Sequence, residues 1–144
     1  MNIDILTNLN LRTSSDFSAI AIVDPIHHQI RWRDAVGSIN QRYKGMRKMY
    51  GSGIIGAVVR HGRLIVIDES VSDAEEKRLQ SPIMLAENLY SAIATTIVVN
   101  QEAIGGLLVG SRSKRTYLSE DIEYVLEKAK ELGLLIENEN KSRN

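Results

Sequence analysis

The 144-residue sequence contains no cysteine, and it has only one tryptophan, one phenylalanine and two prolines. Without thiols, the chain cannot form disulfides, thiolate metal sites, cysteine nucleophiles or thioether-linked chromophores. No apolar run approaches the length of a membrane span, and the N-terminus lacks the basic start and apolar core of a signal peptide. These absences remove several classes of enzyme and predict a cytoplasmic protein.

An excess of charge of either sign is also missing, because 18 basic residues balance 18 acidic ones. No global field therefore draws the chain to nucleic acid or to an anionic membrane, and we expect neither as a partner. The length suits one domain that spans residues 1–144. Partners would be recognised by local surface.

Hydrophobic periodicity predicts an α+β fold, with a central antiparallel sheet, a helix at each end of the chain and short helices inserted between strands. Segments 37–50 and 68–80 have weak periodicity and are expected to be irregular, with at most one helical turn in the first. Strands are predicted over residues 17–23, 29–36, 64–67, 91–99 and 103–110, and helices over 3–11, 53–61, 82–89 and from Ser119 to a tail that frays from Glu137.

Glycines 51, 53 and 56 lie where the second predicted helix begins, and Pro82 opens the next helix. The only tryptophan, Trp32, lies on a strand face with Ile30, because strand side chains alternate. Two helix N-termini and a large aromatic suit an enclosed pocket that binds a monovalent anion through backbone N–H groups. The residues alone equally allow a simple turn at the glycines and a core role for Trp32.

The order of these elements resembles a GAF domain over nearly the whole chain. The resemblance is carried by the segment 85–91, followed by Ile97-Val98-Val99 and by the glycine-containing strand 105–110. It implies the GAF fold, with the short inserted helices placed around a ligand pocket.

A second, narrower resemblance is carried by four parts of the sequence in succession: Trp32, the segments 37–44 and 51–56, and the pair Pro82-Ile83. This succession resembles the NreA family of nitrate receptors, in which a stand-alone GAF protein senses nitrate and modulates a sensor histidine kinase of a two-component system. The resemblance implies nitrate as the ligand and a histidine kinase as the partner. The ligand-binding residues that it implies are Trp32, Ile54, Ile55, Pro82 and Ile83, with Met84 as a weaker addition.

Two positions depart from that family. Ser81 stands where an aromatic residue tends to precede the Pro-Ile pair, and Ile55 is bulkier than the small residue often found at its place. Both departures bear on anion selectivity.

Catalytic constellations are missing from the sequence: it holds no Ser/His/Asp set, carboxylate pair or phosphate-binding lysine motif at a plausible spacing. The three histidines have no carboxylate or cysteine partners at metal-ligand spacing. GAF-type methionine sulfoxide reductases depend on cysteines, which this chain lacks. We therefore expect a sensor without enzymatic activity, without a metal and without a cofactor other than its ligand.

Two other functions fit the same residues. The aliphatic side chains at 54, 55 and 83 suit a small apolar ligand such as a branched-chain amino acid. Alternatively, the domain is a ligand-free dimerisation module built on the apolar stripe of its last helix, which includes Leu132 and Ile136. The basic segment with Arg42, Lys44, Arg47 and Lys48 is either a docking surface or a solvated loop.

Overall fold

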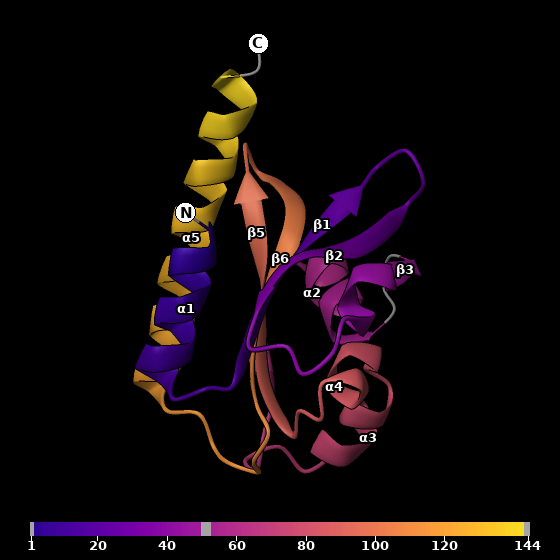
Figure 1. Cartoon of the computed structure of the whole chain (residues 1–144), viewed down its shortest axis with the longest axis vertical. Coiled ribbons are helices and arrows are strands. Elements are labelled where there is room, and N and C mark those ends of the chain that lie inside the picture. The colour runs from indigo at the N-terminus through magenta and orange to yellow at the C-terminus, as the bar shows by residue number, and fades with distance from the viewer. Residues whose placement is uncertain (1, 50–52, 143–144) are drawn as a thin grey trace.

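The computed structural model describes residues 2–49 and 53–142 (Figure 1). Within them, six antiparallel strands form one sheet in the order β3-β2-β1-β6-β5-β4. Two hairpins, β1–β2 and β5–β6, make its centre, and two short strands form its edges. The strands are β1 (Phe17–Asp24), β2 (Gln29–Val36), β3 (Arg47–Met49), β4 (Ile65–Ile67), β5 (Ser91–Val99) and β6 (Glu102–Ser111).

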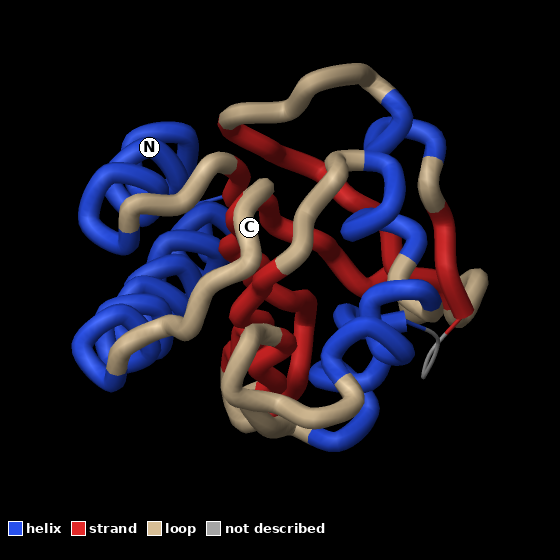
Figure 2. The backbone as a smooth tube through the Cα atoms, turned by 90° about the horizontal axis from the view of Figure 1, so that it is seen from below, coloured by secondary structure: helices blue, strands red, loops and turns tan. Residues whose placement is uncertain are grey.

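The helices divide between the two faces of the sheet (Figures 1 and 2). The terminal helices α1 (Asn2–Thr13) and α5 (Ser119–Ser142) lie side by side on one face. The inserted elements are on the opposite face: the 3-10 turn η1 (Arg42–Gly45), α2 (Gly53–His61), α3 (Ala74–Leu79) and α4 (Pro82–Ala86). This arrangement confirms the predicted α+β class and the GAF-like layers.

Each face of the sheet carries its own buried cluster, because successive strand residues point to opposite sides. Leu107 and Val109 face the terminal helices, whereas Leu108 between them faces the inserted helices. We call these two clusters the terminal-helix core and the inserted-helix core. The inserted-helix core includes Phe17, Ile30, Trp32, Tyr43, Ile54, Ile55, Val58, Ile83, Met84, Leu89 and Leu108.

The predicted irregular segments contain two regular elements, β3 and α3. Strand β3 forms by pairing with β2, with Arg47 opposite Arg31, and its own sequence has no strand-like alternation. Helix α3 has no apolar stripe, because its one buried residue is Arg78. Both elements depend on tertiary partners that a local pattern does not reveal.

Two predicted helix ends are wrong. Helix α4 stops at Ala86 instead of Leu89, since Asn88 adopts a left-handed φ of 56° and the Leu89 N–H donates to the Met84 carbonyl at 2.8 Å. Helix α5 does not fray at Glu137 but continues to Ser142, and Lys141 pairs with Glu137 at 3.3 Å across one turn.

The apolar stripe of α5 packs on the sheet of its own chain. Leu132 is fully buried and Ile136 is 6% exposed. These side chains therefore offer no surface to a second copy while the domain is folded. No helix within residues 2–49 and 53–142 is long and apolar enough to cross a membrane.

Candidate functional site

Trp32 faces the inserted helices from strand β2. Ile30 and Trp32 are buried on this side, while Arg31 and Arg33 point to the other and are exposed, as the alternation predicts. The tryptophan is 6% exposed, and its indole N–H has no acceptor among the described residues. An indole N–H that donates to no described residue can donate to a ligand instead.

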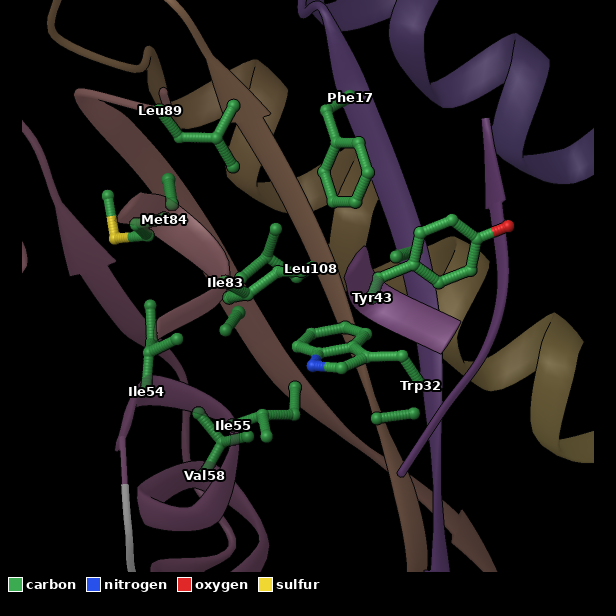
Figure 3. Close-up of a cluster of buried hydrophobic side chains, with 14 of the residues drawn as sticks. Phe17, Trp32, Tyr43, Ile54, Ile55, Val58, Ile83, Met84, Leu89 and Leu108 are labelled. Carbon is green, nitrogen blue, oxygen red and sulfur yellow. The ribbon is translucent and has the colours of Figure 1, made fainter. Parts of the chain in front are cut away.

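Ile55 and Ile83 approach the Trp32 ring from two different inserted helices (Figure 3). The indole nitrogen is turned toward the space between them. Ile55 also lies directly over β6, where a Cβ on Gly106 would come within 2.4 Å of the Ile55 Cδ1 atom. The missing side chain at Gly106 thus lets the bulky Ile55 fit close to the sheet.

The N-termini of α2 and α4 meet beside this group. Gly53 begins α2 with a φ of 69°, and a Cβ there would lie 3.6 Å from Pro82 Cδ. Pro82 has no N–H, and the Met84 and Leu85 N–H groups both donate to the Ser81 carbonyl. Ile83 is therefore the residue of this turn whose N–H has no partner among the described residues.

The six predicted residues do not form one ring around a common centre. Trp32, Ile55 and Ile83 come together, whereas Ile54 and Met84 lie on the side away from Trp32 (Figure 3). Pro82 is half-buried at the start of α4 and lies near Gly53. Gly51 and Ser52, which the sequence placed in the same glycine loop, lie outside the described residues.

A cavity of about 270 Å³ adjoins the group at Ile54. Of the six predicted residues, only Ile54 lines it. Ser81, one of the two departures from the NreA pattern, lines it as well and is 2% exposed. The Ser81 hydroxyl donates to the Lys77 carbonyl at 3.1 Å, so it is turned back to α3 and not toward Trp32.

A buried carboxylate that the sequence analysis did not single out, Glu87, holds α4 against the preceding loop. Its side chain is fully buried and accepts from Ser38 Oγ at 2.6 Å, from the Ile39 N–H at 3.0 Å and from Arg112 Nη2 at 2.8 Å. The Arg112 guanidinium also donates to the Glu87 and Gly37 carbonyls. A charged residue inside the apolar run from Ile83 to Leu89 was the available signal.

Shifted pKa values occur away from the Trp32 group. The hydrogen bond from His27 lowers the pKa of Asp24 in the β1–β2 turn, and the hydrogen bond to Glu131 raises the pKa of Lys128 on α5. Burial raises the pKa of Tyr117, in spite of hydrogen bonds with Ser15 and Ser111. The predicted site itself contains no charged side chain.

Metal-ligand geometry is equally absent from the part of the chain that the structure describes: no three His, Cys, Asp or Glu side chains are close enough to hold an ion. What the Trp32 group offers is hydrogen-bond donors in an apolar setting. Such a setting suits a small anion or a neutral acceptor, and the side chains of Trp32, Ile55 and Ile83 include no nucleophile or general base.

No protein-family model and no curated protein matches the sequence. Among solved structures, the chain is similar to NreA from Staphylococcus aureus with a mutated nitrate-binding site, at 27% identity and a TM-score of 0.71. That match covers 81% of this chain and 86% of the other. The chain has the fold of a GAF domain and resembles NreA.

More distant structures share the GAF fold. A GAF domain of a phosphoenolpyruvate-protein phosphotransferase from Coxiella burnetii matches at 19% identity and a TM-score of 0.79, over 96% of this chain and 81% of that one. A free methionine-R-sulfoxide reductase from Neisseria meningitidis, solved with its substrate, matches at 18% identity and a TM-score of 0.77, over 96% and 77%. These two similarities concern the fold, and the similarity to NreA supports a ligand-binding sensor module of the GAF type.

Proposed function

We propose that this GAF domain protein is a receptor for nitrate, or for a similar small monovalent anion, and has no enzymatic activity. The observation that carries the proposal is the indole N–H of Trp32, which is turned toward Ile55 and Ile83 and has no acceptor among residues 2–49 and 53–142. The similarity to NreA, whose solved form carries mutations in a nitrate-binding site, supports the choice of anion. The missing cysteines argue against the reductase chemistry known for this fold.

Nitrate suits such a site for a physical reason. A monovalent planar anion loses less hydration energy on burial than phosphate or sulfate, so dipolar donors are sufficient to bind it. The indole N–H of Trp32 is one such donor, and the unpartnered Ile83 N–H at the start of α4 is a second candidate. The positive end of the α2 dipole adds to the attraction for an anion. The aliphatic side chains around them exclude water and strengthen each hydrogen bond.

We further propose that the bound anion is reported to a sensor histidine kinase in the cytoplasm. Helix α4 begins at the candidate site, and Glu87, directly after its last residue, is hydrogen-bonded to the loop residues Ser38 and Ile39. Ile39 is 52% exposed, so a movement of α4 would reach the molecular surface there. The anion would favour one position of this surface loop, and the kinase would bind the two positions with different affinity.

Isothermal titration calorimetry of nitrate against the wild type and the Trp32→Phe variant tests the proposal. Phenylalanine keeps an aromatic ring in the core and removes the indole N–H. A hydrogen bond to a charged ligand contributes about 1.5–3 kcal/mol, so we expect nitrate affinity to fall at least tenfold. The matched control is Tyr43→Phe, which removes a hydroxyl from the same core and should leave the affinity unchanged.

Chloride and sulfate serve as selectivity controls in the same titration. Saturable heat from nitrate alone is the expected result. The proposal is wrong if the folded wild type gives no nitrate heat at millimolar concentration, or if Trp32→Phe binds nitrate as tightly as the wild type.

A further inference from the structure

The cavity of about 270 Å³ is lined by a side of α2 other than the one that carries Ile55. Strand β4, whose Ile65 and Ile67 side chains form one wall, is at one edge of the sheet. Trp32 is on β2, and strands β1, β6 and β5 lie between the two. The cavity is therefore beside the candidate nitrate site and not within it. The two lie on different faces of α2, and both are close to the N-terminus of that helix at Gly53.

Helix geometry explains this separation. Residues Gly53, Ile54 and Ala57 follow each other at spacings of one and three, so they form the side of α2 that faces the cavity. Ile55 and Val58 form the adjacent side and pack in the inserted-helix core. One short helix thus presents different faces to the two places.

The apolar and polar residues that line the cavity are on different sides of it. Its walls are the aliphatic side chains of Ile54, Ala57, Ile65 and Ile67, and its polar part is formed by Lys77, Gln80 and Ser81 from the end of α3 and the link to α4. Among the described residues of the lining, Lys77 is the only one with a charged side chain. A ligand that fills this space must combine a hydrocarbon body with an anionic or accepting end.

Lys77 is available to such a ligand. Its Nζ atom lies 3.7 Å from Asp73 Oδ1, and the two side chains are 44% and 49% exposed. An exposed pair of this kind contributes little free energy, so a carboxylate in the cavity can replace Asp73 as the partner of Lys77. The positive end of the α2 dipole at Gly53 adds to the attraction for a negative group.

We propose that this cavity is a second ligand site, which binds a short aliphatic carboxylate. The hydrocarbon chain contacts Ile54, Ile65 and Ile67, and the carboxylate pairs with Lys77. Because Ile54 belongs to α2, which also carries Ile55, occupation of the cavity can modulate the nitrate site. The binding itself does not depend on whether the Trp32 group binds nitrate.

A test uses 4-methylpentanoate as the probe and follows binding to the full chain by calorimetry. The variant Ala57→Leu fills the cavity with a good helix former, and we expect it to abolish binding. Lys77→Gln keeps a polar side chain without the charge, and we expect about a fivefold loss of affinity, the upper range for an exposed ion pair. The neutral analogue 4-methylpentan-1-ol should bind more weakly than the carboxylate by a similar factor.

Circular dichroism and thermal unfolding of each variant establish that it is folded before titration. The Trp32→Phe variant should bind 4-methylpentanoate like the wild type, which distinguishes this site from the nitrate site. The proposal is overturned if the wild type shows no saturable binding, if Ala57→Leu leaves binding intact, or if Trp32→Phe abolishes it.

Discussion

Glu87 is the residue on which the loop before η1, the end of α4 and the end of β6 converge. It is fully buried, whereas its partner Arg112 keeps 26% of its side chain exposed. Removing one member of a buried ion pair leaves the other charge without compensation, and the cost is usually 3–5 kcal/mol. The partial exposure of Arg112 places Glu87 at the lower end of that range.

We predict that Glu87→Ala lowers the free energy of unfolding by about 3 kcal/mol, because Arg112, Ser38 and the Ile39 N–H all lose their acceptor. Urea denaturation followed by circular dichroism measures this change. The control is Glu102→Ala, an exposed residue on β6, for which we expect a change within about 0.5 kcal/mol. A loss below about 1 kcal/mol for Glu87→Ala would show that the network contributes little.

Tyr117 gives the fold a dependence on alkaline pH. Burial raises the pKa of its hydroxyl above the ordinary value of 10.0. The unfolded chain therefore releases this proton at a lower pH than the native chain does. The stability that Tyr117 contributes is fully present below pH 10 and is lost as the pH rises through the native pKa.

The variant Tyr117→Phe isolates this effect. Below pH 10 we expect it to be less stable than the wild type by about 1 kcal/mol, since the bonds with Ser15 and Ser111 are lost. Urea denaturation between pH 8 and pH 11 should show the difference shrinking above pH 10. A difference that stays constant over this range would contradict the assigned burial of the hydroxyl.

The sequence predicted which residues lie near the site better than it predicted the directions in which their side chains point. The family resemblance singled out Ile54 and Ile55 together, yet consecutive residues on a helix point about 100° apart. Only Ile55 therefore joins Trp32, and Ile54 faces the cavity. The contact between Gly53 and Pro82 needed the tertiary structure, because 28 residues of chain separate them.

At the scale of elements, the central hairpins and the long helices were predictable because each carries its own hydrophobic period. Helix α3 was not predictable, because the residue that fixes it to the rest of the protein is the charged Arg78. The Arg78 Nε donates to the Leu89 carbonyl at 2.6 Å, and the guanidinium stacks 4.0 Å from the centre of the Tyr90 ring. A charged residue in the buried position has no hydrophobic signature. The three-residue strand β3 is similarly defined by its pairing with β2.

The adjacent glycines 105 and 106 of β6 meet different kinds of neighbour, which predicts different costs of adding a methyl group. A Cβ at Gly105 would lie 2.2 Å from the Ala21 carbonyl oxygen, which belongs to the neighbouring backbone. At Gly106 the clash is with the end of the Ile55 side chain, which can rotate. We expect Gly105→Ala to lower the free energy of unfolding by more than about 3 kcal/mol and Gly106→Ala to lower it by about 1–2 kcal/mol.

Chemical denaturation of both variants measures this order. Gly45→Ala is the control, since a Cβ there would meet nothing within 4 Å. In the calorimetric titration, Gly106→Ala should also weaken nitrate binding, because the displaced Ile55 moves toward Trp32. Equal stability losses for the two β6 variants would show that the strand shifts as a unit instead.

At the scale of the whole molecule, one sheet separates two hydrophobic cores and is shared by both. Strand β6 contributes Leu107 and Val109 to the terminal-helix core and Leu108 to the inserted-helix core. Loss of the sheet would therefore disrupt both cores at once. This shared layer predicts that the two faces unfold together.

The single tryptophan makes this prediction testable, because Trp32 reports on the inserted-helix face while far-UV circular dichroism is dominated by α1 and α5 on the other. We expect Leu132→Ala, in the terminal-helix core, to lower stability by about 2–5 kcal/mol. Tryptophan fluorescence and circular dichroism should then shift to the same new urea midpoint. Two separate midpoints would mean that the faces unfold independently.

The edges of the sheet have a consequence for behaviour in a concentrated solution. Within the described residues, the outer strands β3 and β4 span three residues each, so each offers a short row of backbone donors and acceptors to another chain. Long open edges are the templates for intermolecular β-pairing and aggregation. In a crowded cell, copies of this protein that collide edge to edge would gain too few hydrogen bonds to hold together.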